Sequence, residues 1–234
     1  MLDIHREKWR EVPGGNDTDE RRFSSDLLSL ADAELLDLWE AQAVSRADGV
    51  IGWVGPLYRD FFKGRRILEL GSGLGLDGMR FAGQGADWTF ADIAPDNLKV
   101  LRRIADMKGV KAAFHLIDDD LSFDDLGTFD GVLACGSLHH VPFDVARVEC
   151  ANVLKHLRPG GRWIELVYPP ERWVKSGSPG FDQWGKMTDG DRTPWAEWYD
   201  GDKLRRRLAP ARFRTILDFN FADDHFKWLD LEAL

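Results

Sequence analysis

The stretch "ILELGSGLGLDG", residues 67–78, has glycines at the spacing of a ligand-binding loop. Gly71, Gly73 and Gly75 give the pattern GxGxG, while Gly73, Gly75 and Gly78 give GxGxxG, the dinucleotide fingerprint. Glycine lets the backbone adopt positive φ and approach a ligand closely. The loop therefore predicts a tightly held ligand, and the flanking residues must identify it.

Acidic residues follow the loop at the ends of two apolar runs. Asp92 lies 21 residues after Gly71, and Asp118, Asp119 and Asp120 end the next run. Asp92 can accept hydrogen bonds from both hydroxyls of a ribose, each worth about 1.5–3 kcal/mol to a charged acceptor. NAD and S-adenosylmethionine share that chemistry. An acid after the third run can also accept from an adenine amino group.

Asp77 helps to distinguish the two ligands. It sits near the start of the helix expected after the glycine loop. A dinucleotide places its pyrophosphate at such a helix N-terminus. The charge of Asp77 would oppose the pyrophosphate, which favours S-adenosylmethionine.

Short apolar runs alternate with helical segments from residue 64 onward. Strands are expected at 65–70, 87–93, 111–118, 130–137 and 162–168, with helices at 77–83, 95–109 and 144–157 between them. A helix at 201–209 precedes two strand-like runs, 212–220 and 225–232, at hairpin spacing. This alternation of strands and helices predicts a parallel sheet with helices on both faces. It also predicts a ligand site at the carboxyl edge of the sheet.

Two further regions flank this core. Residues 11–20 are expected to form a loop and residues 24–48 a helix, whereas residues 169–200 contain Gly, Pro, Trp and charges without periodicity. Four of the ten tryptophans lie in this last segment, which argues against disorder there. The predicted domains are an N-terminal helical cap at 1–60, a core at 61–170, a Trp-rich insertion or lid at 171–200, and a C-terminal helix and hairpin at 201–234.

Charge, apolar runs and cysteine content limit which partners the sequence predicts. A formal charge of −9 argues against a nucleic-acid partner, because phosphate contacts need Lys and Arg. The charged N-terminus is not a signal peptide, and no apolar run predicts a membrane span. The two cysteines form no zinc motif, so no metal is expected and a cytoplasmic setting is the default.

A longer pattern resembles a known family. The segments "ILELGSGLGLD", "FADIAPDNL", "FDGVLACGSLHHVPFD" and "LKHLRPGGRWIELVYPP" look like the class I S-adenosylmethionine-dependent methyltransferases, in the bacterial branch that modifies small molecules. The resemblance is dense over residues 64–170 and weak over 202–234. It implies a doubly wound, mostly parallel seven-stranded Rossmann-like sheet with a reversed last strand. It also implies S-adenosyl-L-methionine as cofactor.

The same resemblance assigns cofactor-binding residues. The loop would contact the amino-acid part of the cofactor, Asp92 the ribose, Ile93 the adenine ring, and one of two acids the adenine amino group. The full set is Glu69, Gly71, Ser72, Gly73, Asp92, Ile93, Asp118, Asp119 and Cys135. For Glu69 the alternative is a structural carboxylate that bonds the loop amides. For Asp118 and Asp119 it is a loop or capping role.

Methyl transfer is an in-line displacement, so alignment can supply up to about 7–11 kcal/mol. A general base typically adds about 10²–10⁴-fold for a hydroxyl or ammonium acceptor. We hypothesise that His139 is this base; His140 is a second candidate, and both histidines could instead be structural. Glu165, inside an apolar strand, is either a functional acid with raised pKa or an acid facing a satisfied polar partner.

Aromatic residues are candidates for acceptor binding. The set is Tyr168, Trp173, Trp195 and Tyr199. The Trp-rich segment would form a lid over an apolar, aromatic or sugar-like acceptor, and its alternative is a second hydrophobic cluster or a dimer surface. The oligomeric state is open and includes a homodimer.

The sequence therefore predicts methyl transfer to an oxygen or nitrogen of a small metabolite, in a secondary-metabolite or sugar pathway. Two other functions stay open at this point. One is an NAD-dependent oxidoreductase, supported by the overlapping GxGxxG, and the other is a non-catalytic binding protein of the same fold.

Overall fold

The computed structural model describes residues 2–12 and 21–234, and the chain divides into two compact units. One unit is Arg6–Leu116, and the other is Ile117–Leu234 with the N-terminal residues up to His5. The predicted loop at 11–20 lies mostly outside the described residues. Its first two residues form the short strand β1 (Glu11–Val12), which pairs antiparallel with β2 (Arg22–Phe23).

Three parallel strands form the sheet of the Arg6–Leu116 unit. Their order is β5 (Ala113–Leu116), β4 (Asp87–Asp92), β3 (Arg66–Leu70). Helix α5 (Leu76–Gly83) follows β3, and α6 (Pro95–Lys108) follows β4. Proline at the first turn of α6 and Gly109 at φ 63° after its end explain both boundaries.

The N-terminal helices differ from the prediction in one place. They are α1 (Leu2–Trp9), α2 (Ser24–Ser29), α3 (Asp32–Asp48) and α4 (Val54–Phe62). The segment 24–48, which was expected to be helical, is helical except at Leu30 and Ala31, which are extended and separate α2 from α3. Arg103 of α6 donates to the carbonyls of Leu28 and Leu30 at 3.2 and 2.7 Å. This tertiary contact takes carbonyls that a continuous helix would bond internally.

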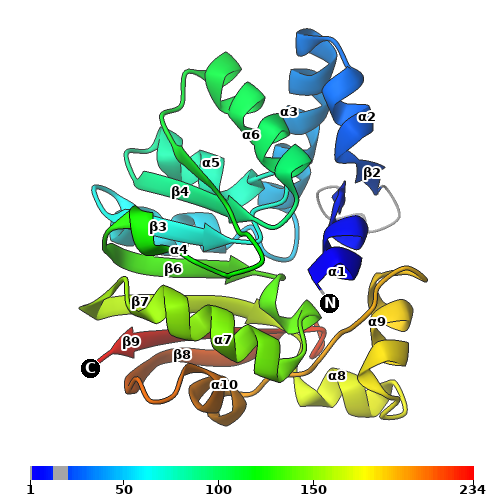
Figure 1. Ribbon diagram of the computed structural model, residues 1–234, viewed down its shortest axis with the longest axis vertical. Coiled ribbons are helices and arrows are strands. Elements are labelled where there is room, and N and C mark those ends of the chain that lie inside the picture. The colour runs from blue at the N-terminus through cyan, green and yellow to red at the C-terminus, as the bar shows by residue number, and fades with distance from the viewer. Residues whose placement is uncertain (1, 13–20) are drawn as a thin grey trace. The chain divides into compact units, whose positions relative to one another are not determined.

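Four strands form the sheet of the Ile117–Leu234 unit. β6 (Phe129–Cys135) is parallel to β7 (Leu157–Val167), while β9 (Phe226–Ala233) is antiparallel to both β7 and β8 (Phe213–Phe221). Helices α7 (Phe143–Leu154) and α10 (Gly201–Leu208) pack beside these strands, as Figure 1 shows. Two short 3₁₀ turns, η1 (Asp124–Leu126) and η2 (Leu138–His140), flank β6.

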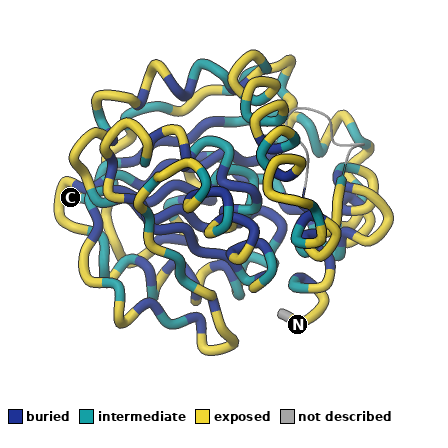
Figure 2. Tube along the Cα trace, turned by 90° about the horizontal axis from the view of Figure 1, so that it is seen from above, coloured by how far each residue is buried: buried dark blue, intermediate teal, exposed yellow. Residues whose placement is uncertain are grey.

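The strand order is β5-β4-β3-β6-β7-β9-β8. This order, with its reversed last strand β9, confirms the predicted seven-stranded, mostly parallel α/β sheet. Strands β3, β4 and β6 are mostly buried, whereas β5 and β8 contain no buried residue. Figure 2 shows the buried segments in dark blue and the exposed turns in yellow. The alternation of apolar runs and amphipathic helices therefore produces the expected layers in each unit. The predicted domain boundaries stay a prediction.

The Trp-rich segment is folded rather than irregular. It contains α8 (Pro170–Lys175) and α9 (Phe181–Asp189). Tyr168 and Trp198 form an isolated parallel β-bridge. Its core is a hydrophobic cluster, which we call the lid cluster. Its members are Tyr168, Trp184 and Ala196, with Trp173, Phe181, Trp198 and Phe226 packed around them. The segment thus forms the second hydrophobic cluster that the sequence left as an alternative.

Candidate active site

The glycine loop adopts the left-handed backbone that its sequence predicts. Gly71, Gly73 and Gly75 have φ of 68°, 52° and 59°. A Cβ on Gly73 would meet no atom within 4 Å, so this position faces open space. A Cβ on Gly75 would lie 2.5 Å from Leu101 Cδ2. Gly73 can therefore lie against a ligand, whereas Gly75 is required for packing.

Gly78 has a packing role as well, because an added Cβ would lie 2.1 Å from Glu69 Oε2. In the dinucleotide fingerprint the middle glycine must let the backbone approach a pyrophosphate. That middle glycine is Gly75, which packs against the side chains of Leu101 and Phe90 instead. The geometry favours the GxGxG interpretation of the loop.

Asp92 lies at the end of β4 and reaches the glycine loop. Its carboxylate is buried and accepts hydrogen bonds from the backbone N–H of Gly73 (2.9 Å) and of Ala94 (2.8 Å). Asn97 Nδ2 donates to it at 3.2 Å. Burial raises the pKa of Asp92, and these hydrogen bonds oppose that rise. The structure thus brings together the loop glycine and the acid that the sequence assigned to one site.

Glu69 is buried in β3 and has a side-chain partner. Trp88 Nε1 donates to Glu69 Oε2 at 2.7 Å. Burial, followed by the charge of Asp77, raises the pKa of Glu69 to about 8. Glu69 is therefore a protonated acid at neutral pH. It links β3 to β4 directly beneath Gly78, a structural role that differs from bonding to the loop amides.

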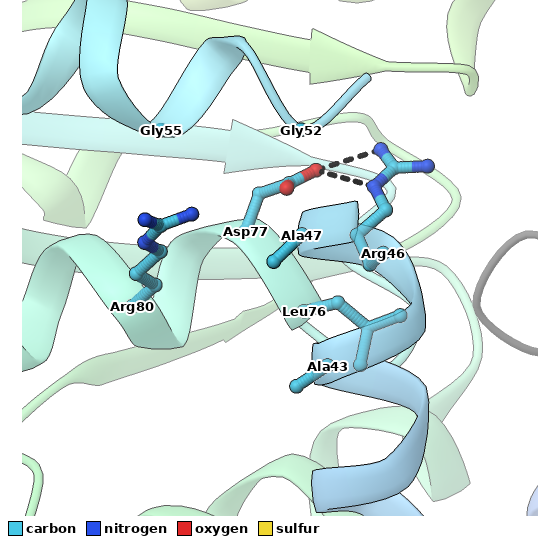
Figure 3. Close-up of a pocket in the computed structure, with 8 residues that line it drawn as sticks. All are labelled: Ala43, Arg46, Ala47, Gly52, Gly55, Leu76, Asp77 and Arg80. Carbon is cyan, nitrogen blue, oxygen red and sulfur yellow. Dashed lines mark hydrogen bonds and ion pairs between the residues drawn. The ribbon is translucent and has the colours of Figure 1, made fainter. Parts of the chain in front are cut away.

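Asp77 forms an ion pair with Arg46. It lies in the first turn of α5, where Arg46 Nη2 from α3 contacts its carboxylate at 2.7 Å (Figure 3). Arg46 therefore compensates part of the charge of Asp77, and opposition of Asp77 to a pyrophosphate stays a prediction. The pocket beside this pair has a volume of about 10 Å³, room for about one water molecule.

The remaining predicted cofactor residues have less defined surroundings. Ser72 is buried and donates to the carbonyls of Glu69 and Ala91, while Ile93 is half-buried. Cys135 is half-buried at the end of β6. Asp118 and Asp119 are both exposed.

Asp118 also makes a local contact. Its Oδ1 accepts from the backbone N–H of Asp120 at 3.1 Å, as a loop acid would. This contact matches the loop role left open for Asp118. Binding of an adenine amino group stays a prediction for Asp118 and Asp119.

His139, the first candidate base, lies in the Ile117–Leu234 unit. It lies in η2 after β6, is 1 % exposed, and its two ring nitrogens have no hydrogen-bond partner among the described residues. Its ring centroid lies 4.1 Å from that of Tyr168 and 4.2 Å from that of His140. Burial, followed by the charge of His140, lowers the pKa of His139 well below its usual value. His139 is therefore a neutral imidazole that can accept a proton.

Each ring nitrogen of His140 lies near an oxygen atom of the Trp-rich segment. Its Nδ1 lies 3.0 Å from the carbonyl oxygen of Trp195, and its Nε2 lies 3.5 Å from Asp189 Oδ2. The hydroxyl of Tyr168 donates to the same Asp189 oxygen at 2.9 Å. Sequence reasoning missed Asp189, because it lies in a segment without periodicity and no motif marks it.

Glu165 faces a polar partner, as its second alternative predicted, although its Oε1 has no hydrogen-bond partner among the described residues. Its Oε2 forms an ion pair with Arg207 of α10 and accepts from Trp163 Nε1 at 2.8 Å. The side chains of Glu165 and Arg207 are both 0 % exposed. This pair joins α10 to β7, so the geometry favours a structural role over the predicted catalytic one.

The predicted acceptor-binding aromatics already have internal contacts. Trp173 Nε1 donates to the carbonyl of Pro179 at 2.9 Å, and Trp195 Nε1 donates to Glu197 at 3.0 Å. Tyr199 is buried, with the guanidinium of Arg207 4.5 Å from its ring centroid. Tyr168 borders His139 and is the member of this set nearest to the candidate base. Acceptor binding by any of the four stays a prediction.

Across residues 2–12 and 21–234, no group of three or more His, Cys, Asp or Glu side chains is arranged to hold a metal ion. Within the same residues, no helix is long and apolar enough to cross a bilayer.

One family model matches the central part of the chain. Residues 68–163 match the family model described as "Methyltransferase domain". This segment runs from β3 to β7 and contains the glycine loop, Asp92 and His139.

Curated relatives match a stretch of similar length. The "Ubiquinone biosynthesis O-methyltransferase" of Methylocella silvestris is 40% identical over 100 residues, which are 42% of this chain and 38% of the relative. A protein of the same name from Xanthomonas axonopodis pv. citri is 37% identical over 101 residues, 42% of this chain and 41% of the relative. The matched part of the chain thus spans about two fifths of the length of these relatives. They give the oxidoreductase alternative no support.

Solved structures share the fold. A magnesium protoporphyrin IX methyltransferase from Synechocystis PCC 6803, solved with bound S-adenosylhomocysteine, has a TM-score of 0.57 at 17% identity, covering 80% of each chain. An S-adenosylmethionine-dependent methyltransferase from Clostridium acetobutylicum has a TM-score of 0.60 at 13% identity, covering 80% of this chain and 93% of the other. At these identities the likeness concerns the fold alone.

Proposed function

We propose that this chain is an S-adenosylmethionine-dependent methyltransferase that transfers a methyl group to an oxygen of a small molecule. The match of residues 68–163 to the family model described as "Methyltransferase domain" supports this proposal. The observation that carries the proposal is the bond between Asp92 and Gly73 at the open side of the glycine loop. The names of the curated relatives favour oxygen over nitrogen as the acceptor atom.

The residues of the Arg6–Leu116 unit fit this cofactor. Gly73 leaves space beside its backbone, and the adjacent Asp92 carboxylate can accept hydrogen bonds from ribose hydroxyls. Gly71, at φ 68°, and Ile93 flank these two residues. When bound, S-adenosylmethionine supplies a methyl group on a positively charged sulfur. Asp92 and the loop hold and orient it.

His139 serves as the base in this proposal. S-adenosylmethionine would supply the methyl group for the acceptor oxygen. A ring nitrogen of His139 would take and hold the proton that the acceptor hydroxyl loses. Because His139 is neutral and its nitrogens have no hydrogen-bond partner in the described part of the chain, it can take the proton. His139 is 1 % exposed, and its ring packs against Tyr168 of the lid cluster.

Substituting Asp92 with alanine is expected to weaken S-adenosylhomocysteine binding at least about tenfold, which corresponds to ~1.4 kcal/mol. The variant loses the ribose acceptor and the bond that fixes Gly73. Calorimetric titration measures the effect. Asp96→Ala, a change in the neighbouring turn of α6, is the control and should bind normally. Unchanged affinity in Asp92→Ala would reject the ribose assignment.

Methyl transfer itself is tested with labelled S-adenosylmethionine and a panel of phenols, aliphatic alcohols, sugars and amines. We expect label to enter at least one hydroxyl compound. Binding of the cofactor without transfer to any acceptor would favour the non-catalytic alternative.

For the remaining partners we propose a small-molecule acceptor and no nucleic acid, supported by the formal charge of −9. The two free cysteines, Cys135 and Cys150, support a reducing cytoplasm as the location.

A further inference from the structure

His140 joins the loop after β6 to the Trp-rich segment, and its contacts indicate its charge. We propose that His140 is a positioning residue that Asp189 holds as an imidazolium, so that the adjacent His139 stays neutral and able to act as base. The part of this inference that concerns catalysis rests on the proposed methyl transfer. The charge states themselves do not depend on it.

Both ring nitrogens of His140 face atoms that accept hydrogen bonds. The carbonyl oxygen of Trp195, 3.0 Å from Nδ1, can only accept, so Nδ1 carries a hydrogen. Asp189 Oδ2 lies 3.5 Å from Nε2. A lone pair on Nε2 would be repelled by a buried carboxylate, whereas a proton there is attracted to it. The geometry therefore favours hydrogens on both nitrogens, which is the imidazolium.

Asp189 is suited to remain ionised. Tyr168 donates its hydroxyl to Oδ2 at 2.9 Å, and such a bond stabilises the carboxylate form. Asp189 is 8 % exposed, so its charge is little screened by water. Burial and the charge of Asp189 raise the pKa of Tyr168 well above its usual value, so the phenol remains a donor.

The other charged groups around this pair come from three further elements. His5 of α1 responds to the charge of His140, and Arg172 of α8 and Arg207 of α10 act on His139. Arg172 lies over the Tyr168 ring, 3.9 Å from its centroid. Arg207 is paired with Glu165. Asp189 is the acid that faces His140, so removing its charge should have the largest effect on this histidine.

The charge of His140 acts directly on His139. The two ring centroids are 4.2 Å apart in a buried environment, where a second positive charge is costly. His139 therefore stays unprotonated before the reaction, and transfer of the acceptor proton to it makes the charge only transient. In the proposed reaction, His139 takes the proton of the acceptor, and Asp189 acts on His139 through His140.

Nuclear magnetic resonance of histidine labelled with ¹⁵N tests these states in the protein without added cofactor. His140→Gln identifies the His140 signals, and His139→Gln those of His139. We expect His140 to keep both protons at pH 7.5 while His139 is neutral. Asp189→Asn should lower the titration midpoint of His140 by at least about one pH unit and raise that of His139. Asp182→Asn, the same substitution on an exposed residue of α9, should change neither.

A neutral His140 at pH 7.5 in the unaltered protein would overturn the proposal, and so would unshifted midpoints in Asp189→Asn. If Asp189→Asn does not fold, Tyr168→Phe provides the second variant: it retains the carboxylate, so His140 should stay an imidazolium, and a neutral ring would contradict the proposal. A chain with these charge states but without methyl transfer would reject the proposed function and leave the His140 assignment in place.

Discussion

Replacing His139 with alanine is expected to lower kcat by about 10²–10⁴-fold, the usual contribution of a general base. Neither ring nitrogen of the buried His139 has a hydrogen-bond partner among residues 2–12 and 21–234, so the substitution removes no hydrogen bond seen there. Affinity for S-adenosylhomocysteine should be unchanged, because the cofactor residues lie on the glycine loop and β4. Initial rates with a fixed acceptor, together with calorimetric titration, separate the two effects.

Two further measurements make this result specific. His225→Ala removes an exposed imidazole and should retain full turnover. Added imidazole should partly restore the rate of His139→Ala, since it can occupy the space left by the ring and accept the proton. Full turnover in His139→Ala with normal cofactor binding would show that both histidines of the "LHH" segment are structural.

The Arg207→Leu variant is expected to lose about 3–5 kcal/mol of unfolding free energy, the typical cost of breaking a buried ion pair. The change leaves the Glu165 carboxylate buried without its cation. Replacing both members, Glu165→Leu with Arg207→Leu, should recover most of the loss because no charge is then left unpaired. Denaturant unfolding followed by circular dichroism provides the free energies.

The control is an exposed pair, Arg66 with Asp87, whose side chains are 39% and 64% exposed. Arg66→Leu should cost at most about 1 kcal/mol. The double variant also separates the two interpretations of Glu165. A folded double variant that retains methyl transfer would exclude Glu165 as a catalytic acid. A folded but inactive one would contradict the structural role assigned here.

Short-range sequence patterns explain why the strands and loops of the core could be predicted. Strands β3, β4 and β6 are short apolar runs, and glycines or a proline mark the turns beside them, so their positions follow from neighbouring residues. The loop at Gly73 and the acid at Asp92 are predictable for the same reason. Each occupies a fixed place after a strand, and parallel strands end at one edge of a sheet.

Tertiary contacts explain what the sequence could not provide. The break before α3 depends on Arg103, 73 residues from Leu30, and the partner of Glu165 lies 42 residues away. Helices α8 and α9 are short, and aromatic packing rather than an apolar period stabilises them. Asp189 is recognisable only once the fold places it beside His140.

The central claim is that the glycine loop and Asp92 hold an adenosyl sulfonium compound. Calorimetric titration of the purified chain with S-adenosylhomocysteine and, separately, with NAD tests it most directly. We predict saturable binding of S-adenosylhomocysteine with one site per chain and no heat of binding from NAD. Saturable NAD binding, with no response to S-adenosylhomocysteine, would contradict the claim.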